Sequence, residues 1–194
     1  MTAKGGITLD AQGGYLINAG KLSTAGGAGA ISLVAGSVDL FTGSISASAG
    51  LVTINSAGGV IQGAGSVLAA QTLDIRSVGG IGSAGSAIES AASNIALNNS
   101  GSGDVVLRNT GNATVAALNS AAGGDIILST AQAASSSKAG ADGAAGGNIT
   151  IGTVRGISGL TASGGAGSNI SVQAGQGGTG ATGSVGAAGV ASVN

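Results

Sequence analysis

Branched apolar residues occur along this chain in short alternating runs, separated by stretches rich in Gly, Ser and Ala. Each run places two apolar side chains at positions i and i+2, which lie on the same face of a β-strand. The runs begin at Ile7, Ile31, Val52, Leu73, Ile95, Val105, Ile126, Ile149 and Ile170. The pattern predicts short strands whose first and third residues point into a core.

The runs recur at a nearly fixed distance. Successive runs begin 21 to 24 residues apart, except for a step of 10 between Ile95 and Val105. Self-similarity at this period indicates a solenoid, and Gly interrupts the runs too often for helical repeats. A short strand followed by a Gly-rich corner is typical of one rung of a parallel β-helix, in which rungs stack about 4.8 Å apart. We therefore predict an all-β, right-handed parallel β-helix with about 21 residues per coil and roughly eight to nine coils.

Residues 1–194 are interpreted as a single β-solenoid segment of a longer repeat array. The step between Ile95 and Val105 has two explanations: one coil carries an extra strand, or the repeats restart on a different face. Residues 132–147 lack apolar periodicity and are predicted to form a surface loop. Residues 175–194 form a Gly- and Ala-rich tail, which either caps the last rung or is flexible.

The alternation also predicts which side chains point inward. The first and third residues of each run should be buried, as in Ile31, Leu33, Val105, Leu107, Ile126 and Leu128. The middle residues should face outward, as in Ser32, Thr53, Asp74 and Thr150. By the same rule, Val106 and Ile127 should be exposed apolar residues on neighbouring rungs, which form a candidate contact stripe. Arg76 and Arg108 directly follow strands, and we expect them on the outer face, paired with Asp74 or Glu89.

A polar residue precedes several of the main strands. These residues are Asn94, Asp104, Asp125, Asn148 and Asn169. Asn and Asp tolerate the left-handed conformation and bond the local backbone, so we predict a structural ladder of corner residues. The functional alternative is a calcium ladder held by Asp104 and Asp125 on adjacent rungs. Calcium takes six to eight oxygen ligands, and two carboxylates supply few of them.

Composition narrows the classes of function. The chain has 41 Gly, no His, Cys, Pro or Trp, and a formal net charge of -1 with six Lys and Arg in total. So few cations cannot cover a phosphate backbone, which argues against nucleic-acid binding. No apolar stretch approaches the ~20 residues of a membrane span. The usual catalytic bases and nucleophiles His and Cys are missing, so we expect neither an enzyme nor a cofactor.

Three long stretches carry a family resemblance. They are GGITLDAQGGYLINAGKLSTAGGAGAISLVAG, GDVVLRNTGNATVAALNSAAGGDIILSTAQ and GGNITIGTVRGISGLTASGGAGSNISVQA. They resemble the repeat regions of filamentous-haemagglutinin-like exoproteins of two-partner secretion, and the likeness extends from Gly5 to Ala174. The resemblance implies a long secreted β-helical filament, exported through an outer-membrane partner and used in adhesion, aggregation or biofilm. The chain lacks the Asn-Pro-containing secretion domain of that family, so it would be a stalk segment.

The expected function is therefore a structural segment of a secreted or cell-surface bacterial adhesin-like fibre, with a host-cell or matrix surface as a possible partner. The alternative is a self-assembling extracellular filament without a receptor of its own, because open end rungs associate end to end. Ice-binding and polysaccharide-binding solenoids are further alternatives. The Thr residues that recur mid-strand are interrupted by Ser32, Asp74 and Ala96, which disfavours a flat ice-binding face.

Overall fold

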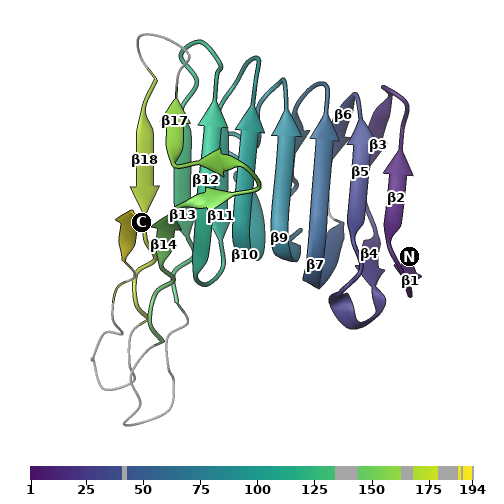
Figure 1. Ribbon diagram of the computed structural model, residues 1–194, viewed down its shortest axis with the longest axis horizontal. Helices are drawn as coiled ribbons and strands as arrows, with labels where there is room; N and C mark the ends of the chain where they lie inside the picture. The colour runs from purple at the N-terminus through teal and green to yellow at the C-terminus, as the bar shows by residue number, and fades with distance from the viewer. Residues whose placement is uncertain (41–42, 134–143, 163–167, 179–187, 189, 194) are drawn as a thin grey trace.

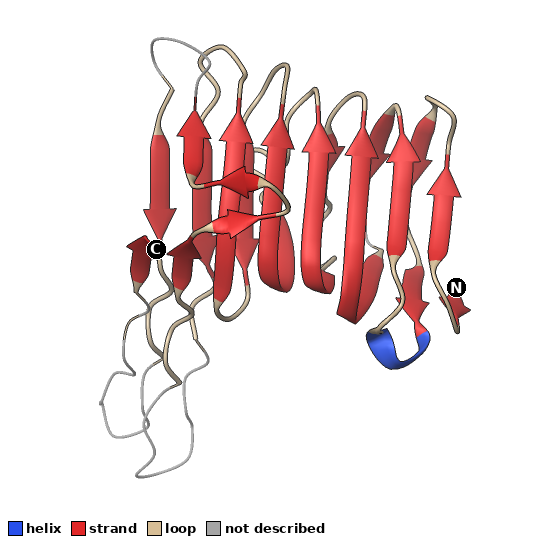
Figure 2. Cartoon of the chain, viewed as in Figure 1, coloured by secondary structure: helices blue, strands red, loops and turns tan. Residues whose placement is uncertain are grey.

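The computed structural model describes residues 1–40, 43–133, 144–162, 168–178, 188 and 190–193. In these residues the regular structure is β-strand, apart from one 3-10 turn at Ala25–Gly27. Parallel strands stack side by side with a spacing of about 22 residues, which confirms the predicted β-solenoid. Figure 1 shows the stack running from β2 at one end to β18 at the other, and Figure 2 shows how little of it is helical.

The strands have the following bounds. They are β1 (Thr2–Ala3), β2 (Ile7–Asp10), β3 (Tyr15–Ile17), β4 (Lys21–Thr24), β5 (Ile31–Ala35), β6 (Ser37–Asp39), β7 (Ser44–Ser56), β8 (Val60–Ile61), β9 (Leu68–Ser77), β10 (Ile88–Asn99), β11 (Val105–Asn109), β12 (Ala113–Asn119), β13 (Ile126–Thr130), β14 (Ile149–Ile151), β15 (Thr153–Val154), β16 (Ile157–Ser158), β17 (Leu160–Ala162), β18 (Ile170–Gln173) and β19 (Ala191–Val193).

The strands form three parallel ladders, which we call the first, second and third faces. The first face runs from β2 through β5 and the second halves of β7, β9 and β10 to β12, which pairs with both β14 and β17. The second face is short and runs through β3, β6 and β8. The third face runs from β1 through β4 and the first halves of β7, β9 and β10 to β11, β13 and β18.

The 10-residue step between Ile95 and Val105 is a change of face. Ile95 pairs with Val115 on the first face, whereas Val105 pairs with Ile126 on the third. Val105 also bridges Ile81, which itself bridges Val60 of the second face. The second and third faces therefore merge at β11. Of the two explanations from the sequence, the restart on a different face is correct.

The predicted number of coils is wrong. The chain makes about six turns instead of eight or nine. One coil for every 21 residues overestimates the number, because the later coils are much longer than one repeat. Asn148 stacks on a residue 36 positions earlier, and Asn169 stacks on one 44 positions earlier. Extra residues in these coils, including the β15–β16 hairpin, do not add rungs.

The interior is a continuous column of Ile, Leu and Val. The predicted inward positions Ile31, Leu33, Val105, Leu107, Ile126 and Leu128 are all buried. Each rung covers the apolar layer of its neighbour, and every Å² of apolar surface removed from water contributes about 25 cal/mol. The alternation of buried and half-buried residues in β5, β13 and β14 follows the predicted two-residue period.

The predicted loop and tail coincide in part with residues that the structure does not describe. Residues 134–143 and most of 179–194 lie outside the described residues. The described ends of the predicted loop contact the predicted tail: the Ala133 N–H donates to the Gln176 carbonyl at 3.0 Å, and the Gly178 N–H donates to the Ala144 carbonyl at 2.9 Å. Within the tail, β19 pairs in parallel with β14 and adds a strand to the first face.

Close stacking at the corners restricts which residues fit there. Gly36 donates its N–H to the Gly14 carbonyl at 2.8 Å, and a Cβ on Gly36 would clash with the backbone carbonyl of Gly13. Gly36→Ala should lower the free energy of unfolding by roughly 1–3 kcal/mol, because backbone atoms must move apart. Gly85→Ala is the control, since a Cβ there meets nothing within 4 Å. Urea denaturation of both variants checks this, and equal stabilities would contradict the packing at Gly36.

Candidate functional site

Three of the predicted corner residues form one ladder at the start of the third-face strands. An Asp104 carboxylate oxygen (Oδ1) accepts a hydrogen bond from the Asp125 N–H at 3.0 Å. Asp125 Oδ1 accepts in turn from the Asn169 N–H at 2.8 Å and from its side-chain Nδ2 at 3.2 Å. The side chain on each rung thus binds the backbone of the next rung, where the chain enters the strand.

The other two predicted corner residues lie elsewhere. Asn148 belongs to a second ladder, in which its N–H donates to Asn112 Oδ1 at 2.9 Å and its own Oδ1 accepts from the Val190 N–H at 2.8 Å. Asn94 is not at a strand start, because β10 continues through it from Ile88 to Asn99. Its side chain contacts the Gln71 carbonyl at 3.4 Å. The five residues therefore do not form a single ladder.

The alternative role of Asp104 and Asp125, a calcium ladder, would need further oxygen ligands from nearby acidic side chains. Across the described residues, no three Asp, Glu, His or Cys side chains lie close enough together to hold a metal ion. One carboxylate oxygen of each Asp already accepts backbone hydrogen bonds from the following rung. The arrangement serves to join rungs.

A buried polar ladder was missed by the sequence interpretation. It lies at the opposite end of the first-face strands and is formed by Ser56, Ser77, Asn99 and Asn119. Asn99 is fully buried and donates from Nδ2 to the carbonyls of Ser102 and Gly103, at 2.9 and 3.0 Å, and to Asn119 Oδ1 at 3.0 Å. Its Oδ1 accepts from the Gly80 N–H at 3.0 Å. These side chains satisfy the backbone groups of a corner that water cannot reach.

A sequence signal for this ladder exists. Each member is the last residue of a first-face strand and stands shortly before a Gly-containing corner, as in Ser56-Ala57-Gly58-Gly59 and Ser77-Val78-Gly79-Gly80. The recurrence was not recognised because Asn and Ser beside Gly are typical of exposed turns. Here the turn folds inward, so the same residues are buried.

Replacing Asn99 with Ala should destabilise the protein strongly. The substitution leaves the Gly80 N–H and the Ser102 carbonyl without their partner inside the corner, and each unsatisfied buried group costs about 1–3 kcal/mol. The Gly103 carbonyl and Asn119 Oδ1 also lose a hydrogen bond, but each still accepts one, from Asn119 Nδ2 and from the Ala121 N–H. We expect a loss of roughly 3 kcal/mol or more, measured by chemical denaturation. Asn98→Ala is the matched control, because Asn98 is the adjacent, outward-facing Asn of the same strand. Comparable losses in the two variants would show that the amide ladder does not stabilise the fold.

The outer surface of the first face carries a cluster of three charged residues. Asp74 on β9 is 1% exposed and lies between two arginines. Arg76 contacts it through Nε at 3.3 Å and Nη2 at 3.5 Å, and Arg155 contacts it through Nε at 3.2 Å. The side chains of Arg76 and Arg155 are 50% and 47% exposed. We call this cluster the arginine triad, and it has a local charge of +1.

Arg155 reaches Asp74 because a hairpin folds over the first face. The hairpin strands β15 and β16 are antiparallel and pair Val154 with Ile157. Val154 and Ile157 pack on Ala96 and Ala116, which are the outward residues of β10 and β12. Figure 1 shows the green hairpin crossing in front of the parallel strands. Its two-residue turn has positive φ at both Arg155 (53°) and Gly156 (81°), as type I′ turns require.

Two sequence predictions about the outer surface are therefore wrong. Asp74 was expected to be exposed, but the hairpin arginine and Arg76 enclose it. Val106 was expected to be an exposed apolar residue beside Ile127, but it is only 4% exposed and Ile127 is half-buried. The proposed contact stripe does not exist. The predicted pairing of Arg76 with Asp74 is confirmed, and Arg108 pairs with Glu89 at 3.6 Å on the third face.

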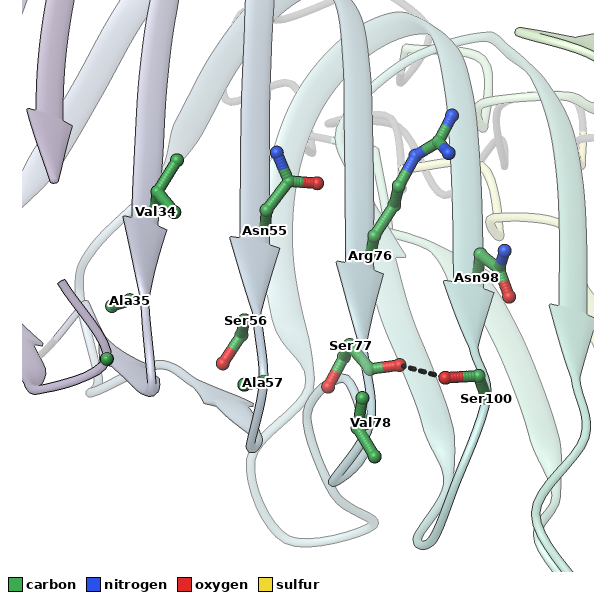
Figure 3. Close-up of a pocket in the computed structure, with 11 residues that line it drawn as sticks. Val34, Ala35, Asn55, Ser56, Ala57, Arg76, Ser77, Val78, Asn98 and Ser100 are labelled. Carbon is green, nitrogen blue, oxygen red and sulfur yellow. Dashed lines mark hydrogen bonds between the residues drawn. The ribbon is translucent and has the colours of Figure 1, made fainter. Parts of the chain in front are cut away.

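Two grooves meet at Arg76 and Asn98. The first has a volume of about 480 Å³ and is lined on one side by Val34, Asn55, Arg76 and Asn98. Figure 3 shows these side chains on successive strands, with Ser77 and Ser100 below them joined by a hydrogen bond. The second groove, of about 370 Å³, lies between Arg76 and the hairpin. Its lining includes Asn98, Leu118, Arg155, Ser158 and Thr161.

The residues that link the two grooves form one straight row across the rungs. Strand register places Val34 beside Asn55, Asn55 beside Arg76, Arg76 beside Asn98, Asn98 beside Leu118 and Leu118 beside Thr161. All six side chains are exposed or half-buried. At about 4.8 Å between strands, the row extends roughly 24 Å along the solenoid axis. We call this row, together with the grooves on either side of Arg76, the trough.

Comparison of the chain with family models, curated proteins and solved structures yields no match. The resemblance to filamentous-haemagglutinin-like repeats therefore rests on the sequence rhythm alone. Among the described residues, no helix is long and apolar enough to cross a membrane.

Proposed function

We propose that this chain is a structural repeat segment of a secreted or cell-surface bacterial fibre of the adhesin type. The observation that carries the proposal is the first-face ladder, in which strands from β2 to β12 pair in parallel along the stack. A solenoid of this kind grows along one axis by adding rungs, so its length is set by the number of repeats. Such a structure is suited to holding other parts of a protein away from a surface.

Further support comes from the sequence. The Gly-x-Ile-x-Leu rhythm resembles secreted filaments that use an outer-membrane partner for export, and the absence of Cys suits an oxidising compartment. A host-cell or matrix surface is the partner that such a fibre would contact. With charged residues at 7% of the chain, the segment acts mainly as a spacer.

A second candidate function is a filament that assembles from copies of this chain. It is favoured by an apolar groove of about 420 Å³ at the far end of the stack, lined by Ile151, Leu160, Val172 and Ala191 among others. Among the described strands, β18 pairs only with β13, so its outer edge has no partner there. Edges of this kind pair readily with another strand.

Antibodies raised against the purified segment would test the proposed location. Intact cells of the source organism, or their culture medium, should bind the antibody, and mild protease treatment of intact cells should remove the cell-bound signal. A cytoplasmic protein of the same cells is the lysis control. Signal that appears only after lysis would contradict a secreted or surface fibre.

A further inference from the structure

The arginine triad has more donors than its buried carboxylate uses. Arg76 contacts Asp74 through Nε and Nη2, and Arg155 contacts it through Nε alone. Within the described part of the chain, Nη1 of Arg76 and both Nη atoms of Arg155 make no hydrogen bond to the protein. Both arginine side chains are about half exposed and line the same groove. The site therefore offers charged donors to an anion from solvent.

The position of these arginines is unusual for the chain. Of its six Lys and Arg residues, two contact the same carboxylate, that of Asp74. One of them, Arg155, is 81 positions away from Asp74 in the sequence. Arg155 occupies a left-handed turn position (φ 53°), where Asn or Gly fits with less strain. Residues other than Gly that are held in such a strained backbone conformation tend to occur at functional sites.

The residues around the triad indicate which kind of molecule carries the anionic group. Along the trough, Asn55, Asn98, Ser158 and Thr161 offer amide and hydroxyl groups beside the arginines. Among the described residues, the side chain of Asn98 has no hydrogen-bond partner, although it faces both grooves. Amides and hydroxyls in a row match the many hydroxyl groups of an extended sugar chain.

A peptide ligand fits the trough less well. Peptides that bind β-structures as an added strand need a free sheet edge for their backbone hydrogen bonds. The trough lies on the face of the sheet, where the backbone groups of β7, β9, β10 and β12 already pair with neighbouring rungs. The arginine fork suits a carboxylate, which it can bind through two parallel hydrogen bonds.

We propose that the trough binds an extended acidic polysaccharide, with a uronic acid carboxylate held by Arg76 and Arg155 and sugar hydroxyl groups bonded to Asn55 and Asn98. This binding role does not depend on the proposed fibre function, because it concerns the isolated chain. The rival explanation is that the triad only anchors the hairpin to the first face.

Titration calorimetry with polygalacturonate tests the proposal. The polymer should bind, and binding should weaken as NaCl is raised, because the contact is between exposed charges. Fully methyl-esterified polygalacturonate, which keeps the sugar chain and loses the charge, should not bind. Polyglutamate, which has carboxylates without sugar hydroxyls, should bind at least tenfold more weakly. Absence of binding to polygalacturonate, or equal binding of either comparison polymer, would overturn the proposal.

Variants distinguish binding from anchoring of the hairpin. Arg76→Gln should weaken polygalacturonate binding by roughly tenfold or more, because a charge-assisted contact is lost. Asn98→Asp should also weaken polygalacturonate binding by roughly tenfold or more, although it leaves every member of the triad in place. The new carboxylate lies beside Arg76 and repels the anionic polymer. Arg76→Lys keeps the charge without the planar fork, and should give an intermediate affinity. Thermal melts establish that each variant is folded.

Matched controls come from the third face. Arg108 is as exposed as Arg76 and is also paired with an acid, and Ser129 lies beside it on the next strand. Arg108→Gln and Ser129→Asp therefore repeat the two charge changes outside the trough and should leave the affinity unchanged. If folded Asn98→Asp protein binds as the native chain does, or the third-face variants weaken binding equally, the trough is not the site.

Discussion

Replacing Leu128 with Asp is expected to abolish folding of the coils around β13. Leu128 is 1% exposed and pairs with Leu107 on the preceding rung and Val172 on the following one. The change removes a buried leucine, which costs about 2–5 kcal/mol, and leaves a carboxylate without a partner in the apolar column. Far-UV circular dichroism during thermal unfolding should show a much lower melting temperature.

The adjacent residue provides the control for this prediction. Ser129 is half-buried and faces outward beside Arg108, so an Asp at this position has both water and a cation. Ser129→Asp should change the free energy of unfolding by less than about 1 kcal/mol. If the two variants melt at the same temperature, the assignment of inward and outward faces in β13 is wrong.

Concentration-dependent association is the second large effect that we expect. The end groove around Leu160 and Val172 leaves apolar surface open, and β2 at the other end pairs only with β5 among the described strands. Both ends therefore present strand edges, and contacts between unlike ends do not close into a ring. Light scattering should show a mass that rises with protein concentration and changes little with salt, because the net charge is only -1.

Charges placed at the ends should prevent this association. Leu9 is half-buried in the first coil and packs against the core, and Leu160 lines the end groove. Leu9→Lys and Leu160→Lys should each leave a particle of one chain's mass at concentrations where the native chain is larger. Thr53→Lys adds the same charge in the middle of the stack and should have no such effect. Equal masses for all four proteins would contradict association through the ends.

The period of the apolar residues was sufficient to predict the solenoid and its core. Leu33 and Leu107 each lie two residues from another apolar residue, on the same face of a strand, and both are buried. This alternation can be read from neighbouring residues alone. The coil count failed because the length of a late coil depends on residues between strands. The residues of the β15–β16 hairpin, for example, do not recur along the sequence, so the period of the apolar residues does not predict them.

The candidate site was less predictable for physical reasons. Asp74 occupies an outward position in its strand, but it is buried and contacts both Arg76 and Arg155, which belongs to a distant hairpin. Asn99 has the local sequence of an exposed turn, and its burial depends on the corner of the neighbouring rung. In each case a contact between coils overrides the preference of the local sequence.

Electron cryo-microscopy of the concentrated native chain is the most direct test of the central claim, which is that these coils are the stacking unit of a fibre. We expect rods that lengthen with concentration, with strands perpendicular to the rod axis and a repeat of about 4.8 Å along it. Particles of a single chain at every concentration, or chains joined side by side through the faces of the solenoid, would contradict the account.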